Sequence, residues 1–355
     1  SRRPLAFERA EDPMNPTPSS LPTRFSSLAD LARLPWFTAL EDRVVVSDDS
    51  IGPIVDVHGH VALAYVRPMQ LDLNREWPRT EYYLPSCCAV DLLPYVNRNF
   101  PPAELAAMKK DLVGNAMNDR GMRRTHTVPN LVKEMDELGI VRTCLLPIDF
   151  PVFSENARHA VDAGKKDPRI LAFGSVHPYA KDPKGKLAEQ AHGGIHGVKV
   201  HPNIQMIRPD AARAMDLYRY CADANLPVLW HCGPVGIEPA LGRYLTQVKW
   251  YEKPIAENPK TTFILGHSGA LQYKAALDLM NRYPNVYCET SSLGLVAIRE
   301  FIERGDPDRM LFGSDWPFYH QAIPLAKVLI ATEDRKDVRA KILRDNALKL
   351  LRIEV

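Results

Sequence analysis

Short apolar runs alternate along the chain with longer segments in which apolar residues recur at helical spacing. Eight runs have the length and composition of buried β-strands: 53–60, 142–148, 170–178, 197–202, 227–233, 261–269, 285–291 and 310–317. In the segment 127–140, between the first two runs, Leu131, Met135 and Leu138 fall on one helix face. The pattern therefore predicts β-strands that alternate with α-helices.

The spacing of the runs indicates a fold class. From the second run onwards, the runs recur at the spacing of a βα unit. Eight such units predict a (β/α)8 TIM barrel of parallel strands. The main alternative is a doubly wound open sheet, but no G-x-G-x-x-G motif follows the first run, which disfavours a dinucleotide-binding fold.

Two segments lie outside the regular pattern. We expect residues 51–355 to form the barrel, with 61–126 as a long insertion in the first βα loop. Loops that follow barrel strands cover the mouth where substrates bind, so the insertion is predicted to be a lid or a wall that shapes the substrate site. A passive contact between subunits is the alternative. Residues 1–50 begin with a polar stretch rich in Pro and Ser and are predicted to be a partly flexible N-terminal extension.

The polar residues of these runs gather at their C-terminal ends. The first run, PIVDVHGH, carries Asp56, His58 and His60 at alternate positions, which predicts one shared strand face. Taken alone, H-x-H also fits a polar face with solvated histidines. Later runs end, in chain order, with Lys199 and His201, His231, His267, and Asp315. Parallel barrel strands end at one mouth, so these side chains are expected to meet there, and a divalent metal ion is the natural partner for them.

The ordered set of motifs resembles the amidohydrolase superfamily. D-x-H-x-H, G-V-K-V-H-P, G-H-S-G and G-S-D-W-P are similar to its amidohydrolase-related branch, which contains aminocarboxymuconate-semialdehyde decarboxylase and various lactone and amide hydrolases. The resemblance covers residues 53–350. It implies that the metal ligands are His58, His60, His231 and Asp315, and that Asp315 also transfers a proton. In single-metal members His267 would polarise the metal-bound water, and in two-metal members it would bind the second ion with His231.

The metal and the state of Lys199 remain open at this point. Mixed nitrogen and oxygen ligands suit zinc, with iron or manganese as alternatives, and one or two ions fit the set. Zinc lowers the pKa of its bound water to about 7, which supplies hydroxide at neutral pH. Lys199 is either a carboxylated lysine that bridges two ions or a plain cation that pairs with a substrate carboxylate, because burial can lower a lysine pKa enough for carboxylation.

Weaker candidates surround this set. Asp56 is expected to support the metal site from behind the ligands. His201, Arg67, Arg243 and Trp316 are candidates for substrate contact, although His201 also fits a cap beside Pro202 and Trp316 also fits simple packing. Glu289 could orient a ligand or lie outside the mouth. The remaining loop and helix histidines are predicted to be solvated: His126, His159, His192, His196 and His320.

These residues favour a metal-dependent hydrolase of a small-molecule amide, lactone, ester or thioester. The alternative is non-oxidative decarboxylation of an aromatic or unsaturated acid at the same site. Two residues favour hydrolysis. Many decarboxylases of the branch carry Glu at the position of Asp56, and Lys199 in the fourth run fits a two-metal hydrolase. A metal-storage or scaffold protein would not require the acid–base pair of His267 and Asp315.

Composition narrows the choice of partner and compartment. The formal net charge of the 355 residues is +2 and no basic block stands out, which disfavours nucleic acid as a partner. No apolar run approaches the length of a membrane span. The six cysteines are scattered, which fits free thiols in a reducing cytoplasm. A small-molecule substrate is expected, and the resemblance implies a homodimer.

Overall fold

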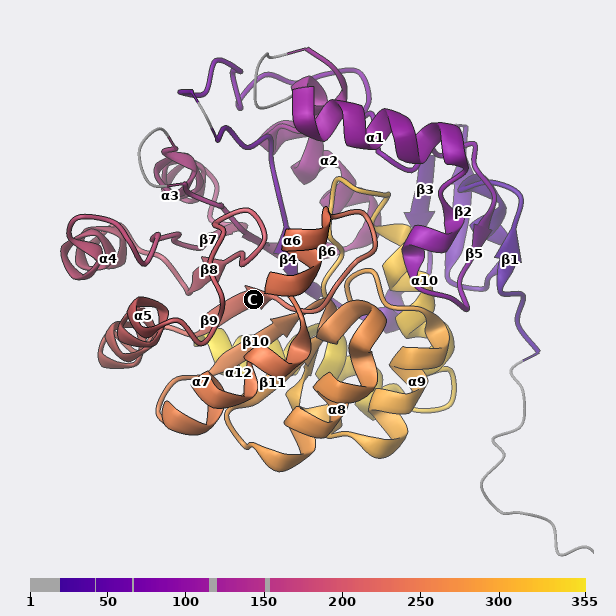
Figure 1. Ribbon diagram of the computed structural model, residues 1–355. Helices are drawn as coiled ribbons and strands as arrows, with labels where there is room; N and C mark the ends of the chain where they lie inside the picture. Colours follow the sequence, from indigo (N-terminus) through magenta and orange to yellow (C-terminus); the bar gives the residue numbers. More distant parts are fainter. Residues whose placement is uncertain (1–19, 42, 66, 115–119, 151–153) are drawn as a thin grey trace, which may run out of the picture.

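The computed structural model describes residues 20–41, 43–65, 67–114, 120–150 and 154–355, and its central element is a barrel of parallel strands (Figure 1). The strands that correspond to the predicted runs are, in chain order, β4 (Ile54–Gly59), β6 (Ile140–Leu145), β7 (Ile170–Ala172), β8 (Val198–Val200), β9 (Val228–His231), β10 (Phe263–Gly266), β11 (Val286–Glu289) and β12 (Met310–Leu311).

Hydrogen bonds close these strands into a ring. One sheet has the order β4-β6-β7 and another has the order β8-β9-β10-β11-β12, and all of their pairings are parallel. Parallel bridges from Gly174 to Val198 and from Gly59 to Trp316 join the two sheets at both seams. The predicted (β/α)8 barrel is therefore confirmed, and the open doubly wound sheet is not.

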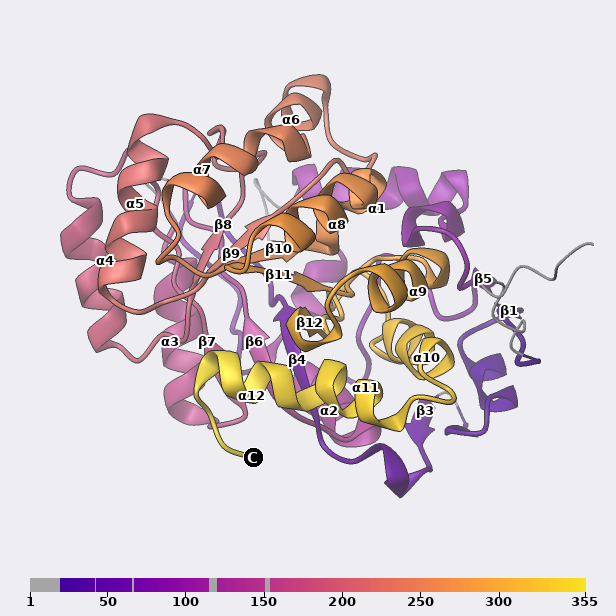
Figure 2. The same ribbon diagram turned by 90° about the horizontal axis from the view of Figure 1, so that it is seen from below.

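Helices cover the outside of the barrel (Figures 1 and 2). They are α2 (Val128–Leu138), α3 (Asn156–Lys166), α4 (Pro183–His192), α5 (Ala212–Asp223), α6 (Ala240–Leu245), α7 (Glu252–Glu257), α8 (Tyr273–Arg282), α9 (Leu295–Arg304), α10 (Ala322–Ala331), α11 (Lys336–Ala340) and α12 (Asn346–Leu351). The predicted helix at 127–140 is α2. Its Leu131, Met135 and Leu138 are buried, and Gly139 ends it with a φ of 69°, the left-handed conformation that glycine adopts at little cost.

Shorter helical turns connect these elements. Turns of 3₁₀ helix span Ala29–Arg33, Asp49–Ile51, Val96–Asn99, Met122–Thr125, Val248–Trp250, His267–Gln272 and Pro307–Arg309, and a π-helical turn spans Lys341–Asp345. None of the helices within the described residues is long and apolar enough to cross a membrane.

The described part of the N-terminal segment packs onto the barrel. β2 (Phe37–Leu40) and β3 (Arg43–Val46) pair antiparallel, and Leu31, Phe37 and Val44 join the main hydrophobic core. β1 (Arg24–Phe25) pairs with β5 (Val90–Asp91), so the N-terminal segment is hydrogen-bonded to the insertion. Residues 1–19 lie outside the described residues.

The insertion contains a helix of its own. α1 (Pro102–Gly114) lies on the upper side of the molecule in Figure 1, above the barrel strands. Buried residues elsewhere in the insertion, including Leu84, Leu92 and Val96, belong to the main hydrophobic core. The insertion is therefore packed against the barrel.

Candidate active site

Three predicted ligands converge where the first and last barrel strands end. The Oδ1 atom of Asp315 lies 3.6 Å from Nε2 of His58 and 3.6 Å from Nε2 of His60. All three side chains are buried. They form one of two groups among the described residues whose ligand atoms all lie within 4.8 Å of one another.

An irregularity in β4 precedes His58. Asp56 pairs with Thr143 of β6 and Gly59 pairs with Leu145, so β4 has one more residue than β6 over this interval, which is a β-bulge. Asp56 directs its carboxylate to Ser314 Oγ, at 2.5 Å, and to Gln321 Nε2, at 2.8 Å. The ring of His58, beyond the irregularity, faces a different set of residues. The prediction that Asp56 shares one strand face with the two histidines is therefore wrong, because strict alternation does not hold across a bulge.

Asp56 nevertheless supports the site, from behind Asp315. Its carboxylate accepts hydrogen bonds from the backbone N–H and the hydroxyl of Ser314, the residue before Asp315. It also accepts from the backbone N–H of His58 at 3.0 Å. Burial raises the pKa of Asp56 to about 6. This carboxylate fastens β4 to the loop that carries Asp315.

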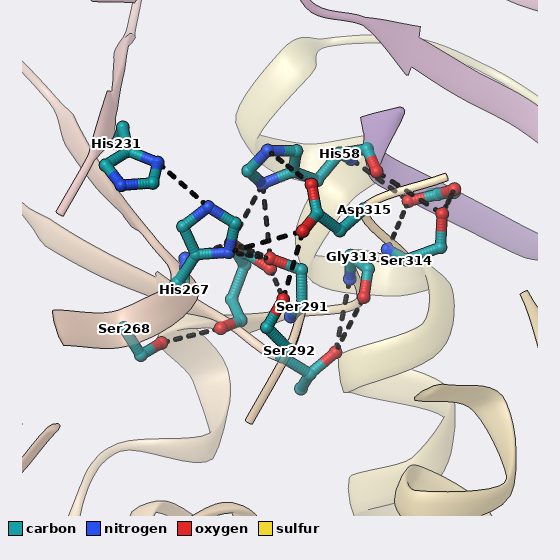
Figure 3. A network of polar contacts seen from close by, with 12 residues as sticks. His58, His231, His267, Ser268, Ser291, Ser292, Gly313, Ser314 and Asp315 are labelled. Carbon is teal, nitrogen blue, oxygen red and sulfur yellow. Dashed lines mark hydrogen bonds and ion pairs between the residues drawn. The ribbon is translucent and has the colours of Figure 1, made fainter. Parts of the chain in front are cut away.

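A hydrogen-bonded group centred on Ser291 lies on the opposite side of His58 (Figure 3). Glu289 Oε1 lies 3.0 Å from Nδ1 of His58 and accepts the Ser291 hydroxyl at 2.7 Å. Ser291 Oγ lies 2.8 Å from Nδ1 of His267, and His267 Nε2 lies 3.1 Å from Nδ1 of His231. If every Nδ1 is the donor, all of these bonds are satisfied. This assignment leaves Nε2 of both His58 and His231 unprotonated, as a metal-binding nitrogen must be.

The second three-residue group belongs to this network. It consists of His58, His267 and Glu289. Ser291 Oγ is within hydrogen-bond distance of all three side chains. The Ser291 hydroxyl thus lies among these three side chains and joins them by hydrogen bonds.

His267 lies at the barrel mouth beside His231 and Asp315. Both of its ring nitrogens have partners in this arrangement, Ser291 on one side and His231 on the other. Its backbone is also unusual, because His267, Ser268 and Ala270 have φ values of 58°, 42° and 49°, in the strained left-handed region. His267 thus contacts His231 directly, and its part in polarising a metal-bound water or binding a second ion stays a prediction.

His60, His201 and Lys199 also lie at the barrel mouth, where the sequence predicts them. Nδ1 of His60 lies 2.8 Å from the Leu146 carbonyl, which directs Nε2 towards Asp315. The ring of His201 stacks on His231 with centroids 4.1 Å apart, and His201 lines the cavity described below. Lys199 is buried, and its Nζ lies 3.3 Å from Nε2 of His58.

Burial sets the protonation of these groups. Burial, reinforced by neighbouring positive charges, holds the pKa of His58, His231 and His267 well below the usual range, so these imidazoles are neutral at pH 7. Neutral imidazole is the form that ligates a metal. Burial lowers the pKa of Lys199 to about 8 and raises that of Glu289 to about 7.

The donor set fits one divalent ion. Nε2 of His58, Nε2 of His60 and Oδ1 of Asp315 face one another, and each imidazole is hydrogen-bonded through its other nitrogen. Metal-bound histidines are held in this way. Nitrogen and oxygen donors of this kind suit zinc and manganese.

A cavity of about 490 Å³ opens above these ligands. His60, Lys199, His231, His267 and Asp315 line its floor, and five aromatic side chains line it elsewhere: Tyr65, Tyr83, Tyr95, Phe150 and Phe318. Three of these aromatic residues come from the insertion, as do Lys109 and Arg123, which also line the cavity. The insertion thus forms part of the wall around the candidate active site.

Three predicted substrate contacts lie elsewhere. Within the part of the chain that the structure describes, Arg67, Arg243 and Trp316 do not line the cavity. Arg243 is exposed on α6, and Arg67 is half-buried. Trp316 is fully buried, and its Nε1 donates to Glu134 at 3.0 Å. Sequence position placed these residues in the correct loops but could not show which way each side chain points.

Sequence reasoning missed two serines of the site, Ser291 and Ser292. Glu289, for which the sequence left open a role in orienting a ligand, contacts His58 Nδ1 and accepts the Ser291 hydroxyl. His126 and His320 are buried, so the prediction that they are solvated is wrong. Their partners explain this, since His126 Nε2 bonds the Glu81 carbonyl and His320 Nδ1 lies 3.4 Å from Glu134.

Comparisons with solved structures agree with the fold. An uncharacterised TIM-barrel protein from Bordetella bronchiseptica is 19% identical, with a TM-score of 0.59, and the match covers 84% of this chain and 98% of that chain. A probable 2-pyrone-4,6-dicarboxylic acid hydrolase from Acinetobacter baumannii is 15% identical, with a TM-score of 0.54 and coverage of 84% and 99%. A 5-carboxyvanillate decarboxylase from Novosphingobium aromaticivorans, solved with bound manganese, is 15% identical, with a TM-score of 0.56 and coverage of 86% and 99%.

Family membership rests on the sequence itself. No curated protein matches the chain. The family model described as Amidohydrolase matches residues 147–353, which is more than half of the chain and includes Lys199, His231, His267 and Asp315. With the barrel closed and the predicted ligands gathered at its mouth, the chain belongs to the amidohydrolase family.

Proposed function

We propose that the protein is a metal-dependent, non-oxidative decarboxylase of a small aromatic or unsaturated carboxylic acid. The observation that carries the proposal is one compact ligand group, His58, His60 and Asp315, beneath a cavity with aromatic walls. Aromatic walls suit a planar ring. A largely apolar cavity favours decarboxylation, because the localised charge of the carboxylate spreads over the ring as carbon dioxide leaves. The decarboxylase with bound manganese supports this reading as a relative in fold.

A resident divalent ion would be held by His58, His60 and Asp315, and the resemblance to the family adds His231 as a fourth ligand. When bound, the ion supplies a Lewis acid that holds and polarises the substrate carboxylate or carbonyl. Glu289 and the Leu146 carbonyl orient the two histidines of the first strand. Zinc, iron and manganese remain the candidates, and the ligand types do not separate them.

The side chains on the cavity floor have distinct roles in the proposed reaction. Decarboxylation breaks the bond between the carboxyl carbon and its neighbour, and the electron pair left on that neighbour then takes up a proton. Asp315 is the acid on the floor that can hold and deliver this proton. Lys199 and His201 line the cavity beside it and can bind an anionic substrate.

The insertion supplies the walls that exclude water. Tyr65, Tyr83 and Tyr95 line the cavity and are all contributed by residues 61–126. Exclusion of water strengthens every electrostatic interaction with the substrate. We therefore propose that the insertion shapes substrate choice, as its position in the first βα loop predicts.

Hydrolysis of a lactone, ester, amide or thioester is the second candidate. Lys199 Nζ lies 3.3 Å from Nε2 of His58, so a carboxylated Lys199 would reach the metal ligands and could bridge two ions. The probable pyrone hydrolase among the similar folds supports this alternative. In that case Asp315 would take the proton from the attacking water.

Metal content and product identity separate the two candidates. Metal-loaded protein would be incubated with hydroxybenzoates and, separately, with lactones and esters of similar size, while carbon dioxide and acid release are recorded. Decarboxylation predicts about one ion per chain and carbon dioxide release that stops in His58→Ala. About two ions per chain, with acid release and no carbon dioxide, would contradict the proposal and favour hydrolysis.

Two further expectations stay proposals. The six free cysteines support a reducing compartment, and we propose a cytoplasmic enzyme. We also propose a homodimer, on the resemblance to the family. Light scattering of the purified protein tests the homodimer, and fractionation of cells that express the protein tests the cytoplasmic location.

A further inference from the structure

Glu238 is a carboxylate that the proposed chemistry leaves without a role. It lies between β9 and α6, lines the cavity and is 7% exposed. Apart from Asp315, it is the only acidic residue among the described residues that line the cavity. Since Asp315 belongs to the metal ligands, Glu238 is the cavity's remaining anionic acceptor.

One oxygen of Glu238 is held and the other is not. Oε2 accepts a hydrogen bond from the backbone N–H of Ile237 at 2.9 Å. Oε1 is shielded from solvent and has no hydrogen-bond partner among the described residues. The side-chain amide of Asn97, another lining residue, donates to the Val235 carbonyl. A buried carboxylate oxygen without a partner is unfavourable, so this side chain contributes little to stability.

The surroundings of Glu238 connect it to the reacting end of the cavity. Burial, followed by the negative charge of Asp315 and that of Glu238, raises the pKa of the Tyr95 hydroxyl well above its usual range. Tyr95 itself lines the cavity. A substrate that fills the cavity above Asp315 would therefore also come close to Glu238. The nearby lining residues Val235, Ile237 and Pro239 are apolar and offer no competing side-chain donor.

We propose that Glu238 recognises a hydrogen-bond donor on the substrate, a hydroxyl or amino group on the ring of an aromatic carboxylic acid. Rotation about the terminal bond of the glutamate, a broad torsion, turns Oε1 towards the cavity. The carboxylate accepts two donors and rejects groups of similar size that offer none. This inference rests on the proposed function, which supplies the aromatic acid as substrate. It adds that this acid carries a hydrogen-bond donor on its ring.

The test is binding of matched benzoates to the metal-loaded, full-length protein by calorimetry. For each ring position, the affinities of hydroxybenzoate, aminobenzoate and methylbenzoate are compared. The methyl group matches the other two substituents in size but donates no hydrogen bond. The hydroxy or amino compound is expected to bind at least about tenfold more tightly than the methyl compound at one position. Glu238→Gln keeps the side-chain shape but replaces the charged carboxylate by a neutral amide with one acceptor oxygen, so it is expected to reduce the preference by at least about threefold.

Glu303→Gln is the matched control, because Glu303 is an exposed glutamate on α9. It should leave the preference unchanged. Thermal melting of Glu238→Gln checks the fold, and its midpoint should not fall, since Oε1 has no partner to lose. Equal binding of the methyl and donor compounds, a preference that Glu238→Gln leaves undiminished, or no binding of any benzoate would overturn the inference.

Turnover measured on the same samples keeps the two proposals separate. Carbon dioxide release without a donor preference contradicts the role of Glu238 alone. A donor preference that Glu238→Gln weakens, without any metal-dependent turnover, contradicts the decarboxylase proposal alone.

Discussion

Ser292 Oγ donates a 3.0 Å hydrogen bond to Oδ2 of Asp315, and this bond leaves Oδ1 facing the two histidines of the first strand. The hydroxyl of Tyr319 lies 2.7 Å from the same Ser292 oxygen. Ser292 and Asp315 both have left-handed backbones, with φ values of 62° and 63°, which non-glycine residues rarely adopt. Two strained residues thus hold one carboxylate in a fixed direction.

Ser292→Ala should weaken metal binding without unfolding the protein. Loss of the bond to Oδ2 frees the Asp315 carboxylate to rotate, and loss of such a supporting partner weakens metal affinity by about 10- to 100-fold. Competition with a fluorescent chelator measures the affinity, and the absorption spectrum of the cobalt-loaded protein reports the ligand field. An unchanged spectrum and an unchanged affinity would show that Ser292 does not position Asp315.

Asp315→Asn and His58→Ala should each abolish turnover while the barrel remains folded. Asparagine keeps the shape of Asp315 but cannot deliver a proton, and alanine removes one metal ligand. A loss of about 10³-fold or more is expected for either, because each residue is proposed to act in the transition state. Far-ultraviolet circular dichroism checks the fold. Near-normal turnover by metal-stripped His58→Ala would contradict the metal-dependent mechanism.

Tyr65→Leu should change substrate choice more than metal content. Tyr65 lines the cavity from the insertion and is not one of the metal ligands. The smaller apolar side chain should raise KM for aromatic acids by about tenfold, through loss of ring contacts, with little change in bound metal. A point variant is preferable to deletion, which would uncover core residues such as Leu84 and Leu92. Unchanged KM values across a panel of acids would contradict a substrate-shaping role for this part of the insertion.

Lys327 should make stability rise with pH above neutrality. This lysine on α10 is fully buried, its Nζ donates to the Leu293 carbonyl at 2.7 Å, and burial lowers its pKa from 10.5 to about 7. Between these two pKa values the unfolded chain binds a proton that the native protein does not. The free energy of unfolding should therefore increase with pH in this window, by up to about 1.4 kcal/mol per pH unit from this group.

Urea unfolding of Lys327→Met measures that contribution. In the wild-type protein, Lys327 should raise the free energy of unfolding between pH 7.5 and pH 9.5, by roughly 1.4 kcal/mol per pH unit at most. The variant should lack this increase. Lys260→Met, at an exposed position, serves as the control. If Lys327→Met and the wild-type protein respond equally to pH, the buried amine is not the cause.

The sequence pattern was sufficient to predict the barrel, because each strand and each helix shows a local spacing of apolar residues that is typical of its type. It also identified His58, His60 and Asp315, since polar residues at the ends of parallel strands must meet at one mouth. It failed at Asp56, because a one-residue bulge is invisible in an alternating pattern. It also failed at Trp316 and Arg243, because the direction of a loop side chain depends on partners such as Glu134 that are distant in sequence.

Glu289 shows a different limit. A glutamate at a strand end fits either a solvated residue or a buried acceptor, and only its neighbours decide. In the structure it receives the hydroxyl and backbone N–H of Ser291 together with His58 Nδ1, so burial is compensated. A pattern read along one chain does not contain those neighbours.

The pairing of β1 with β5 makes residues near the N-terminus part of the substrate enclosure. The Thr23 carbonyl accepts the Leu92 backbone N–H at 2.8 Å, and Tyr95 and Asn97, which line the cavity, follow within five residues of Leu92. A shortened chain that begins after this pairing would keep every metal ligand and the whole barrel, yet it would release the strand that anchors one side of the entrance. Such a truncated protein would bind its ion normally and hold its substrate poorly.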